Sequence, residues 1–336
     1  MKAWEAARNA LECVLEAKKG ESIIILCDNE KLDVGEAFTN GALNLGLQTR
    51  LIPLKTDANI FRKEIPPQIM EILTKYKPDI YINLLRGSRE ETPFRIALIK
   101  METVERKARL GHCPGVTLDM LTEGALALTV KEHRDMQNFA KTLIQKLSNA
   151  TCIEITNPAG TKVFLNVEGR PFYTDTVIDW KTMKWMNLPT GEVIAAPLED
   201  SLEGTLVCDM AVGGIGPLKA PVKLTIHKGR VESSFSEDLL ALKRIRDSLN
   251  TDEWSDVIGE FAFGINKKAR FVEEFLEAEK MFGTIHIAFG NNSDMPGGKN
   301  KSKNHMDFLI SKPSVKVFDK KGSCMNVLVE GVFQCL

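Results

Sequence analysis

The order of strand-like and helix-like segments in the first half of the chain limits its fold more than any other feature. Short apolar runs alternate there with segments whose apolar residues recur at helical spacing. The strand candidates are Ser22–Asp28, Thr49–Leu54, Asp79–Leu85 and Lys107–His112, and the helix candidates are Val34–Leu45, Pro67–Tyr76, Thr92–Thr103 and Val130–Leu147. Strands that alternate with helices pair in parallel through crossover connections. The pattern predicts an α/β class fold in which residues 1–149 form a doubly wound, Rossmann-like domain around a parallel sheet.

After about Asn149 the sequence changes to pairs of strands joined by tight turns. Cys152–Thr156 and Thr161–Val167 flank a short Asn-Pro-Ala-Gly turn, and residues 221–235 and 315–329 show the same arrangement. Hairpins of this kind build antiparallel sheets. We therefore expect residues 150–336 to form a second domain of the α+β type.

The composition excludes several kinds of partner. The 336 residues carry a formal net charge of -1, whereas nucleic-acid and anionic membrane surfaces require a clustered excess of Lys and Arg. The seven cysteines are scattered and form no C-x-x-C pair, so neither a disulfide framework nor a cysteine zinc site is expected. No apolar run approaches the roughly 20 residues of a membrane span, and the N-terminal segment is an amphipathic helix pattern rather than a signal peptide. We expect a cytoplasmic protein without a nucleic-acid or membrane partner.

Two of the five histidines lie near the C-terminal end, in segments with strand-like alternation. Side chains alternate between the two faces of a strand, so His286 shares a face with Ala288, while the isoleucines and the phenylalanine around it point the other way. His305 and Asp307 likewise share a face. An extended H-x-D segment therefore presents a nitrogen ligand and an oxygen ligand to one point.

Two glutamates stand in similar surroundings upstream. Glu260 lies on the face of Ala262 and Gly264, and Glu192 follows a turn and leads into an apolar run. A carboxylate buried alone in a strand costs several kcal/mol, so a partner is expected. A divalent metal would satisfy these two glutamates together with the two histidines and the aspartate.

Each of these residues also fits a structural role on its own. A histidine in a strand is often a hydrogen-bonded core residue, a glutamate after a turn is often solvated, and Glu260 would also fit an edge strand. The spacing alone therefore leaves a metal site and ordinary strand residues both open. His112, His133 and His227 have no companions in the sequence, and we interpret them as structural.

The segments that carry the five candidate ligands resemble the ligand-bearing segments of the aminopeptidase T / aminopeptidase S family of metalloaminopeptidases. Asn187–Asp209, Gly259–Asn266, Gly283–Gly290 and Asn304–Asp307 follow one another in the same order as in that family. The resemblance implies two neighbouring divalent ions, Zn, Co or Mn, and a homodimer. The residues that match the family's ligands are Glu192, Glu260, His286, His305 and Asp307.

The resemblance also implies an activity. The chain would be an exopeptidase that hydrolyses N-terminal residues from small peptides through a metal-activated water, with Glu192 and Glu260 as catalytic carboxylates. One alternative is a non-haem Fe(II) ring-cleaving dioxygenase of the 2,5-dihydroxypyridine dioxygenase type, which the superfamily also resembles. His286, His305 and Asp307 satisfy its two-histidine, one-carboxylate triad on their own. A second alternative is a metal-binding protein without catalytic activity.

The chain departs from the peptidase family at two places. The family has a tyrosine close to the metals seven residues after its first histidine, and Ser293 stands there in this chain. The loop between the two histidines is also short and rich in Gly and Lys. Both differences lie where the mouth of the active site is expected.

Overall fold

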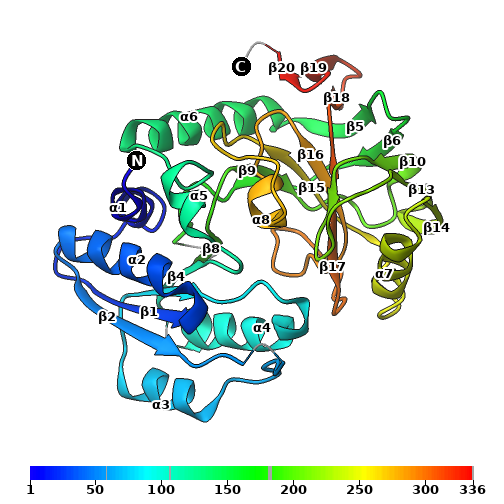
Figure 1. Cartoon of the computed structure of the whole chain (residues 1–336). Coiled ribbons are helices and arrows are strands. Elements are labelled where there is room, and N and C mark those ends of the chain that lie inside the picture. Colours follow the sequence, from blue (N-terminus) through cyan, green and yellow to red (C-terminus); the bar gives the residue numbers. More distant parts are fainter. Residues whose placement is uncertain (58, 106, 181–183, 335–336) are drawn as a thin grey trace. The chain divides into compact units, whose positions relative to one another are not determined.

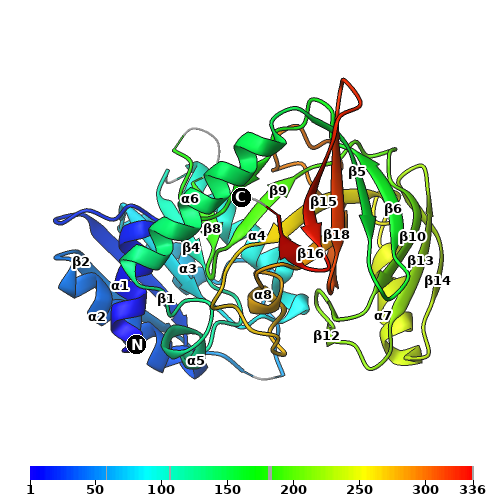
Figure 2. The ribbon, with the colours of Figure 1, turned by 90° about the horizontal axis from the view of Figure 1, so that it is seen from above.

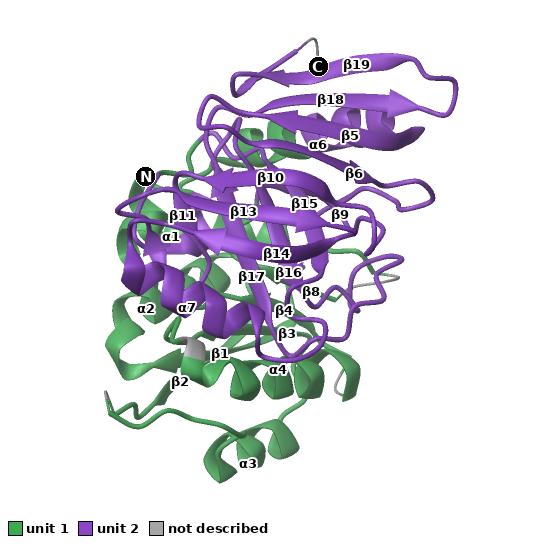
Figure 3. Ribbon diagram, turned by 90° about the vertical axis from the view of Figure 1, so that its right-hand side faces the viewer, with its two compact units in different colours: residues 1–137, 175–190, 268–270 green, residues 138–174, 191–267, 271–336 purple. Residues whose placement is uncertain are grey.

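Contacts divide the chain into two compact units (Figure 3). The computed structural model describes residues 1–57, 59–105, 107–180 and 184–334. Unit 1 consists of residues 1–137, 175–190 and 268–270, and unit 2 consists of residues 138–174, 191–267 and 271–336. Both units are therefore built from segments that are discontinuous in the sequence.

Unit 1 contains a parallel sheet in the strand order β2-β1-β3-β4-β8 (Figure 1). The strands are β1 (Ser22–Asp28), β2 (Gln48–Leu54), β3 (Ile80–Leu84), β4 (Arg109–His112) and β8 (Trp185–Asn187). All neighbouring pairs run parallel, which confirms the predicted fold class for the first part of the chain. The edge strand β8 comes from a later segment whose sequence pattern did not indicate a strand.

Helices cover both faces of this sheet. They are α1 (Ala3–Cys13), α2 (Leu32–Asn44), α3 (Pro67–Lys75), α4 (Thr92–Lys100) and α5 (Leu118–Thr122), with short 3₁₀ turns at Asn29–Lys31 and Arg89–Glu91 and a π-helical turn at Met101–Glu105. Ile24 and Leu26 of β1 pack in one cluster with apolar residues of α3 and α4. The alternate residue Cys27 faces α2, where a Cβ at Gly35 would lie 2.9 Å from its sulfur. Alternate residues of this buried parallel strand thus pack against helices on opposite faces of the sheet. Helix α6 (Val130–Leu147) begins in unit 1 and continues in unit 2.

The carboxyl ends of β1 and β3 carry an ion-pair network. In open α/β sheets this is the edge at which nucleotides and other ligands commonly bind. Here Arg62 pairs with Asp28 at 2.7 Å and with Glu91 at 2.6 Å, and Arg86 also pairs with Glu91 at 2.6 Å. The side chains of Asp28 and Glu91 are fully buried. Side chains of the protein itself therefore satisfy the charges at this edge.

Unit 2 contains two antiparallel sheets. The first has the strand order β14-β13-β10-β6-β5-β18-β19-β20, and several of its strands lie side by side in Figure 2. Its strands are β5 (Ala150–Thr156), β6 (Lys162–Asn166), β10 (Glu203–Cys208), β13 (Val222–His227), β14 (Arg230–Phe235), β18 (Ser314–Asp319), β19 (Cys324–Val329) and β20 (Val332–Phe333). The predicted hairpins at residues 152–167, 221–235 and 315–329 all lie in this sheet. The α+β character predicted for the later part of the chain is confirmed.

The second antiparallel sheet has the order β12-β11-β17-β16-β15-β9-β7. Its strands are β7 (Tyr173–Thr174), β9 (Glu192–Ala195), β11 (Ala211–Val212), β12 (Gly216–Pro217), β15 (Ile258–Gly264), β16 (Ile285–Gly290) and β17 (His305–Ile310). Helix α7 (Leu239–Leu249) follows β14, and the short helix α8 (Phe275–Ala278) lies between β15 and β16.

One face of this second sheet is a tightly packed apolar surface. Phe261 and Phe263 of β15 lie with their ring centroids 4.8 Å apart, and Phe289 and Phe308 pack edge to face at 5.7 Å. All four side chains are completely buried. Burial of this face fixes which way every other side chain of the sheet points, because a one-residue slip would reverse both faces.

Across the described residues, the structure contains no helix that is both long enough and apolar enough to cross a membrane.

Candidate metal centre

Four neighbouring strands of the second sheet, β17, β16, β15 and β9, each contribute to one cluster of polar side chains. In the register of the sheet, His286 lies opposite Ala262, Glu192 lies opposite Gly264, and Ala288 lies between Glu260 and Asp307. His305 lies opposite Gly290. Directly opposed residues of antiparallel strands share a face, so all five candidate ligands lie on the face opposite to the aromatic core. The alanines and glycines of that face leave room for the longer polar side chains.

Glu260 lies at the centre of the cluster. Its Oε1 is 3.2 Å from Nε2 of His286, and its Oε2 is 3.2 Å from Nε2 of His305. Oδ1 of Asp307 is 3.1 Å from the same nitrogen of His305, and Oε1 of Glu192 is 3.5 Å from Nε2 of His286. The structure thus brings together all five residues that the sequence singled out.

The orientation of His305 is fixed from outside the cluster. Its Nδ1 lies 2.8 Å from the carbonyl oxygen of Asn291, so the Nδ1–H group donates to that carbonyl. A backbone acceptor on one ring nitrogen directs the lone pair of the other toward a ligand, which is the usual arrangement around metal-bound histidines. The Nδ1 of His286 is buried and makes no hydrogen bond to the described residues.

The cluster perturbs the acid–base properties of its members. Burial on its own would raise the pKa of Glu260, but hydrogen bonds from His286 and His305 hold it below its usual range. Burial on its own would lower the pKa of His286, but the hydrogen bond and the charge of Glu260 raise it. The pKa of His305 is raised well above its ordinary value, since Asp307 and Glu260 outweigh burial. Each carboxylate therefore favours a positive charge in its surroundings.

Two further residues belong to the cluster, and the sequence analysis missed both. Glu279 and Lys280 follow helix α8, and their side chains are buried. The ammonium nitrogen of Lys280 lies 2.6 Å from Oε2 of Glu192 and 2.8 Å from Oε1 of Glu279. Burial raises the pKa of Glu279 to about 8, although Lys280 lowers it. The stretch around this short helix is rich in Glu and resembles a solvated surface segment, so its pattern carried no signal of burial.

The donor set fits a divalent cation. Four carboxylates, those of Glu192, Glu260, Glu279 and Asp307, share the cluster with the single ammonium group of Lys280. With neutral histidines, and with Glu279 mostly protonated at neutral pH, three ionised carboxylates face one ammonium group. This leaves two uncompensated negative charges in a largely buried place, which is costly without a cation. Two groups of three ligand atoms lie within 4.8 Å of one another, namely Glu192, Glu279 and His286, and Glu260, His286 and Asp307. Imidazole and carboxylate ligands in such groups suit Zn, Co, Mn or Fe.

A polar network holds the loop between β16 and β17. Glu199 pairs with Arg170 at 2.6 Å and accepts hydrogen bonds from the amide of Lys299 and the side chain of Asn292. Hydrogen bonds from Arg170 and Lys299 lower the pKa of Glu199 against the effect of burial. Glu199 therefore anchors the loop. Ser293 donates its hydroxyl to Oδ1 of Asn291, the residue whose carbonyl holds His305.

The other three histidines have structural surroundings. Burial lowers the pKa of His112 to about 3 and that of His133 to about 4, so both are neutral side chains inside unit 1. His227 pairs with Glu203 at the surface, at 3.0 Å.

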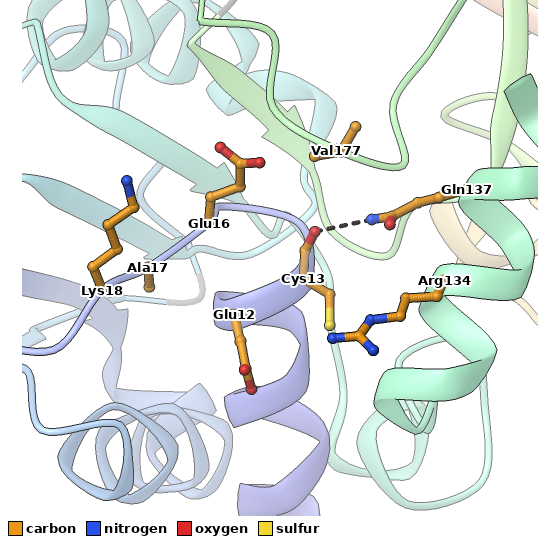
Figure 4. Close-up of a pocket in the computed structure, with 8 residues that line it drawn as sticks. All are labelled: Glu12, Cys13, Glu16, Ala17, Lys18, Arg134, Gln137 and Val177. Carbon is orange, nitrogen blue, oxygen red and sulfur yellow. Dashed lines mark hydrogen bonds between the residues drawn. The ribbon is translucent and has the colours of Figure 1, made fainter.

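A separate cavity of about 420 Å³ lies within unit 1. Figure 4 shows Gln137 donating to the carbonyl of Cys13 and Arg134 extending toward the same residue. Burial raises the pKa of the Cys13 thiol to about 11, so it is not a reactive thiolate. The residues that line the cavity are Glu12, Cys13, Glu16, Ala17, Lys18, Arg134, Gln137 and Val177. The chemistry points to the cluster in unit 2 rather than to this cavity.

Comparisons with known proteins show a family match and two similar folds. The sequence model of the thermophilic metalloprotease (M29) family matches residues 127–333, a range that includes the whole cluster. The structure of AmpT from Thermus thermophilus is similar over 99% of this chain and 99% of its own, with a TM-score of 0.76 and 16% sequence identity. The structure of 2,5-dihydroxypyridine dioxygenase from Pseudomonas putida KT2440 is similar over 99% of this chain and 97% of its own, with a TM-score of 0.72 and 15% identity. At these identities both likenesses establish the fold alone. No curated protein sequence matches the chain significantly.

Proposed function

The chain belongs to the thermophilic metalloprotease (M29) family, and we propose that it is a metal-dependent aminopeptidase that releases N-terminal residues from small peptides. The observation that carries the proposal is the position of Glu260, whose two oxygens each lie 3.2 Å from the Nε2 atom of a different histidine. This carboxylate and both imidazoles converge on one place where a divalent ion can bind.

The residues that would hold the ion are Glu260, His286, His305 and Asp307. The chemistry that a divalent ion supplies when bound is Lewis acidity, which acidifies water and polarises a carbonyl group. Zn, Co and Mn all suit this set of nitrogen and oxygen donors. Glu192 is not included in this set, because Lys280 binds one of its oxygens.

Glu192 is proposed to handle protons and the substrate's amino group. Its Oε2 binds Lys280, while its Oε1 faces the cluster at 3.5 Å from Nε2 of His286. A carboxylate in this position can accept a proton from water and return it to the leaving amine. The surplus of carboxylates also attracts the protonated amino terminus of a peptide. That attraction would restrict cleavage to the first residue.

The dioxygenase alternative has one observation in its favour. His286, His305 and Asp307 could form a two-histidine, one-carboxylate triad for Fe(II). Glu260 argues against it, because it contacts both histidines and would fill a position that dioxygen and the organic substrate need. The four-donor set therefore favours hydrolysis.

The test uses purified protein loaded separately with Zn, Co, Mn and Fe(II). We expect release of the first residue from short peptides with a free amino terminus, and none from the same peptides after N-acetylation. A chelator should abolish the release, and adding back the ion should restore it. Oxygen uptake with 2,5-dihydroxypyridine and no peptide cleavage would establish the dioxygenase instead. Bound metal with neither reaction would identify a metal-binding protein without this activity.

A further inference from the structure

The polar cluster contains two places for a cation, and they share one histidine. Glu192, Glu279 and His286 surround the first place, and Glu260, His286 and Asp307 surround the second. In each group the ligand atoms lie within 4.8 Å of one another. The fold therefore offers the outline of a two-cation site, like the pair of ions expected from the sequence resemblance.

Lys280 already binds the carboxylates of the first place. Its ammonium nitrogen lies 2.6 Å from Glu192 and 2.8 Å from Glu279, distances typical of charge-assisted hydrogen bonds. Only about 1% of the residue is exposed, so the ammonium group has little access to water as an alternative partner. Moving a buried charge away from its partners is strongly unfavourable. A metal ion at this place would have to compete with Lys280 for the same oxygens.

The backbone holds Lys280 in this position. Its carbonyl accepts a hydrogen bond from the amide of Asn266 at 2.9 Å, and its own amide donates to Glu277 at 3.1 Å. Asn266 lies two residues beyond the end of β15, and an isolated bridge joins it to Met281. The end of helix α8 is thus tied to the strand that carries Glu260. Lys280 is a fixed part of the cluster rather than a mobile surface lysine.

The charges favour one divalent ion beside Lys280. The four carboxyl groups supply at most four negative charges, while Lys280 and one divalent ion supply three positive charges. A second divalent ion would raise the positive total to five. It would also lie next to a buried ammonium group, where like charges repel strongly because the local dielectric constant is low.

We propose that Lys280 is a built-in cation that occupies the first place, so that the centre binds one divalent ion, at Glu260, His286, His305 and Asp307. This inference rests on the proposed metal-dependent function and refines it. Glu192 is then a positioned carboxylate next to the ion rather than a ligand. The lysine also gives Glu192 and Glu279 a shared positively charged partner when the ion is absent.

The test is the number of ions bound per chain, measured by elemental analysis and by calorimetric titration with Zn and Mn. We expect about one ion for the wild-type protein, about two for Lys280→Met, and about one for Lys280→Arg, which keeps the charge. Lys316→Met is the matched control, because Lys316 is exposed on β18 and should not change the count. Wild-type protein that binds two ions would overturn the inference while leaving the metal-dependent function intact. A folded Lys280→Met protein that still binds one ion would also overturn it.

A second variant keeps the inference testable if Lys280→Met does not fold. Glu192→Gln should retain about one ion per chain, with an affinity within about threefold of the wild-type value. A drop to no bound ion in this variant would make Glu192 a ligand and contradict the inference. Wild-type protein that binds no divalent ion would instead refute the proposed function itself.

Discussion

The ammonium nitrogen of Lys280 lies 2.6 Å from Oε2 of Glu192, inside the same cluster in which Glu260 contacts two histidines. The two residues come from different elements, since Glu192 begins β9 and Lys280 follows α8. Their contact divides the cluster into two parts. In the first part Lys280 supplies the positive charge, and the second part, around Glu260 and Asp307, has no lysine or arginine partner among the contacts described above. The second part is where a divalent ion is expected.

Replacing Glu260 should remove the ion. In Glu260→Gln the central carboxylate becomes a neutral amide, and both histidines lose their charged partner. We expect divalent metal affinity to fall by a factor of roughly 100 or more, above the 10–100-fold typical of residues that only support ligands. Isothermal titration with Zn and Mn measures the change. Glu232→Gln is the control, because Glu232 is exposed on β14. Unchanged affinity in Glu260→Gln would show that Glu260 is not a ligand.

A methyl group at position 213 should disturb Asp307. A Cβ at Gly213 would lie 3.1 Å from Oδ2 of Asp307, so the carboxylate would have to shift by a few tenths of an ångström. Since metal ligation depends on such distances, we expect Gly213→Ala to weaken metal binding several-fold and leave the fold intact. Titration together with far-UV circular dichroism separates the two effects. Wild-type affinity in a folded variant would contradict the expected contact.

The ion pair between Arg170 and Glu199 should stabilise the loop without acting in catalysis. Both side chains are largely buried and lie 2.6 Å apart. Removing one partner leaves a buried charge, so Glu199→Ala should lower the free energy of unfolding by about 3 kcal/mol. A double-mutant cycle with Arg170→Ala, in which urea denaturation measures the free energy of unfolding of each variant, should give a coupling energy of about 1–3 kcal/mol. Metal content should stay constant. A large loss of turnover at unchanged stability would instead assign Glu199 a role in proton transfer.

Acid should weaken unit 1 through Glu91. Burial would raise its pKa, but hydrogen bonds from Arg62 and Arg86 lower it to about 2. Because the folded pKa lies below the unfolded value near 4.5, the stabilisation is present above pH 4.5 and is lost as the pH falls toward 2. The shift corresponds to about 3 kcal/mol at pH 7 and roughly 1 kcal/mol at pH 3. Urea denaturation at pH 7 and at pH 3 measures the free energy of unfolding of the wild-type protein and of Glu91→Gln. The difference between the two proteins should be smaller at pH 3 than at pH 7. A difference that does not depend on pH would contradict this origin.

The strand pleat explains why so much of the site could be predicted. Alternation alone placed Glu260 with Ala262 and His286 with Ala288, and the sheet register joins these faces as expected. Apolar residues on the other face, such as Phe261, fix the register by their burial. Sequence patterns of this kind report which side of a strand faces the core.

Glu279 and Lys280 could not be predicted for the opposite reason. They follow a helix of only four residues, where neither helical nor strand periodicity applies. Their burial arises because residues distant in the sequence surround them, as the contacts of Lys280 with Glu192 and of its backbone with Asn266 show. The strand Trp185–Asn187 was missed for a similar reason, since three residues are too few to show a period.

The most direct measurement is the position of the bound ion in crystals of the metal-loaded protein, located by anomalous diffraction at the absorption edge of Zn. The central claim predicts a peak at about 2.0–2.2 Å from Nε2 of His286 and Nε2 of His305, next to the carboxylates of Glu260 and Asp307. Glu192 should remain bound to Lys280 in the same crystals. An ion held elsewhere in the chain, or fully loaded protein with no peak between these two histidines, would contradict it.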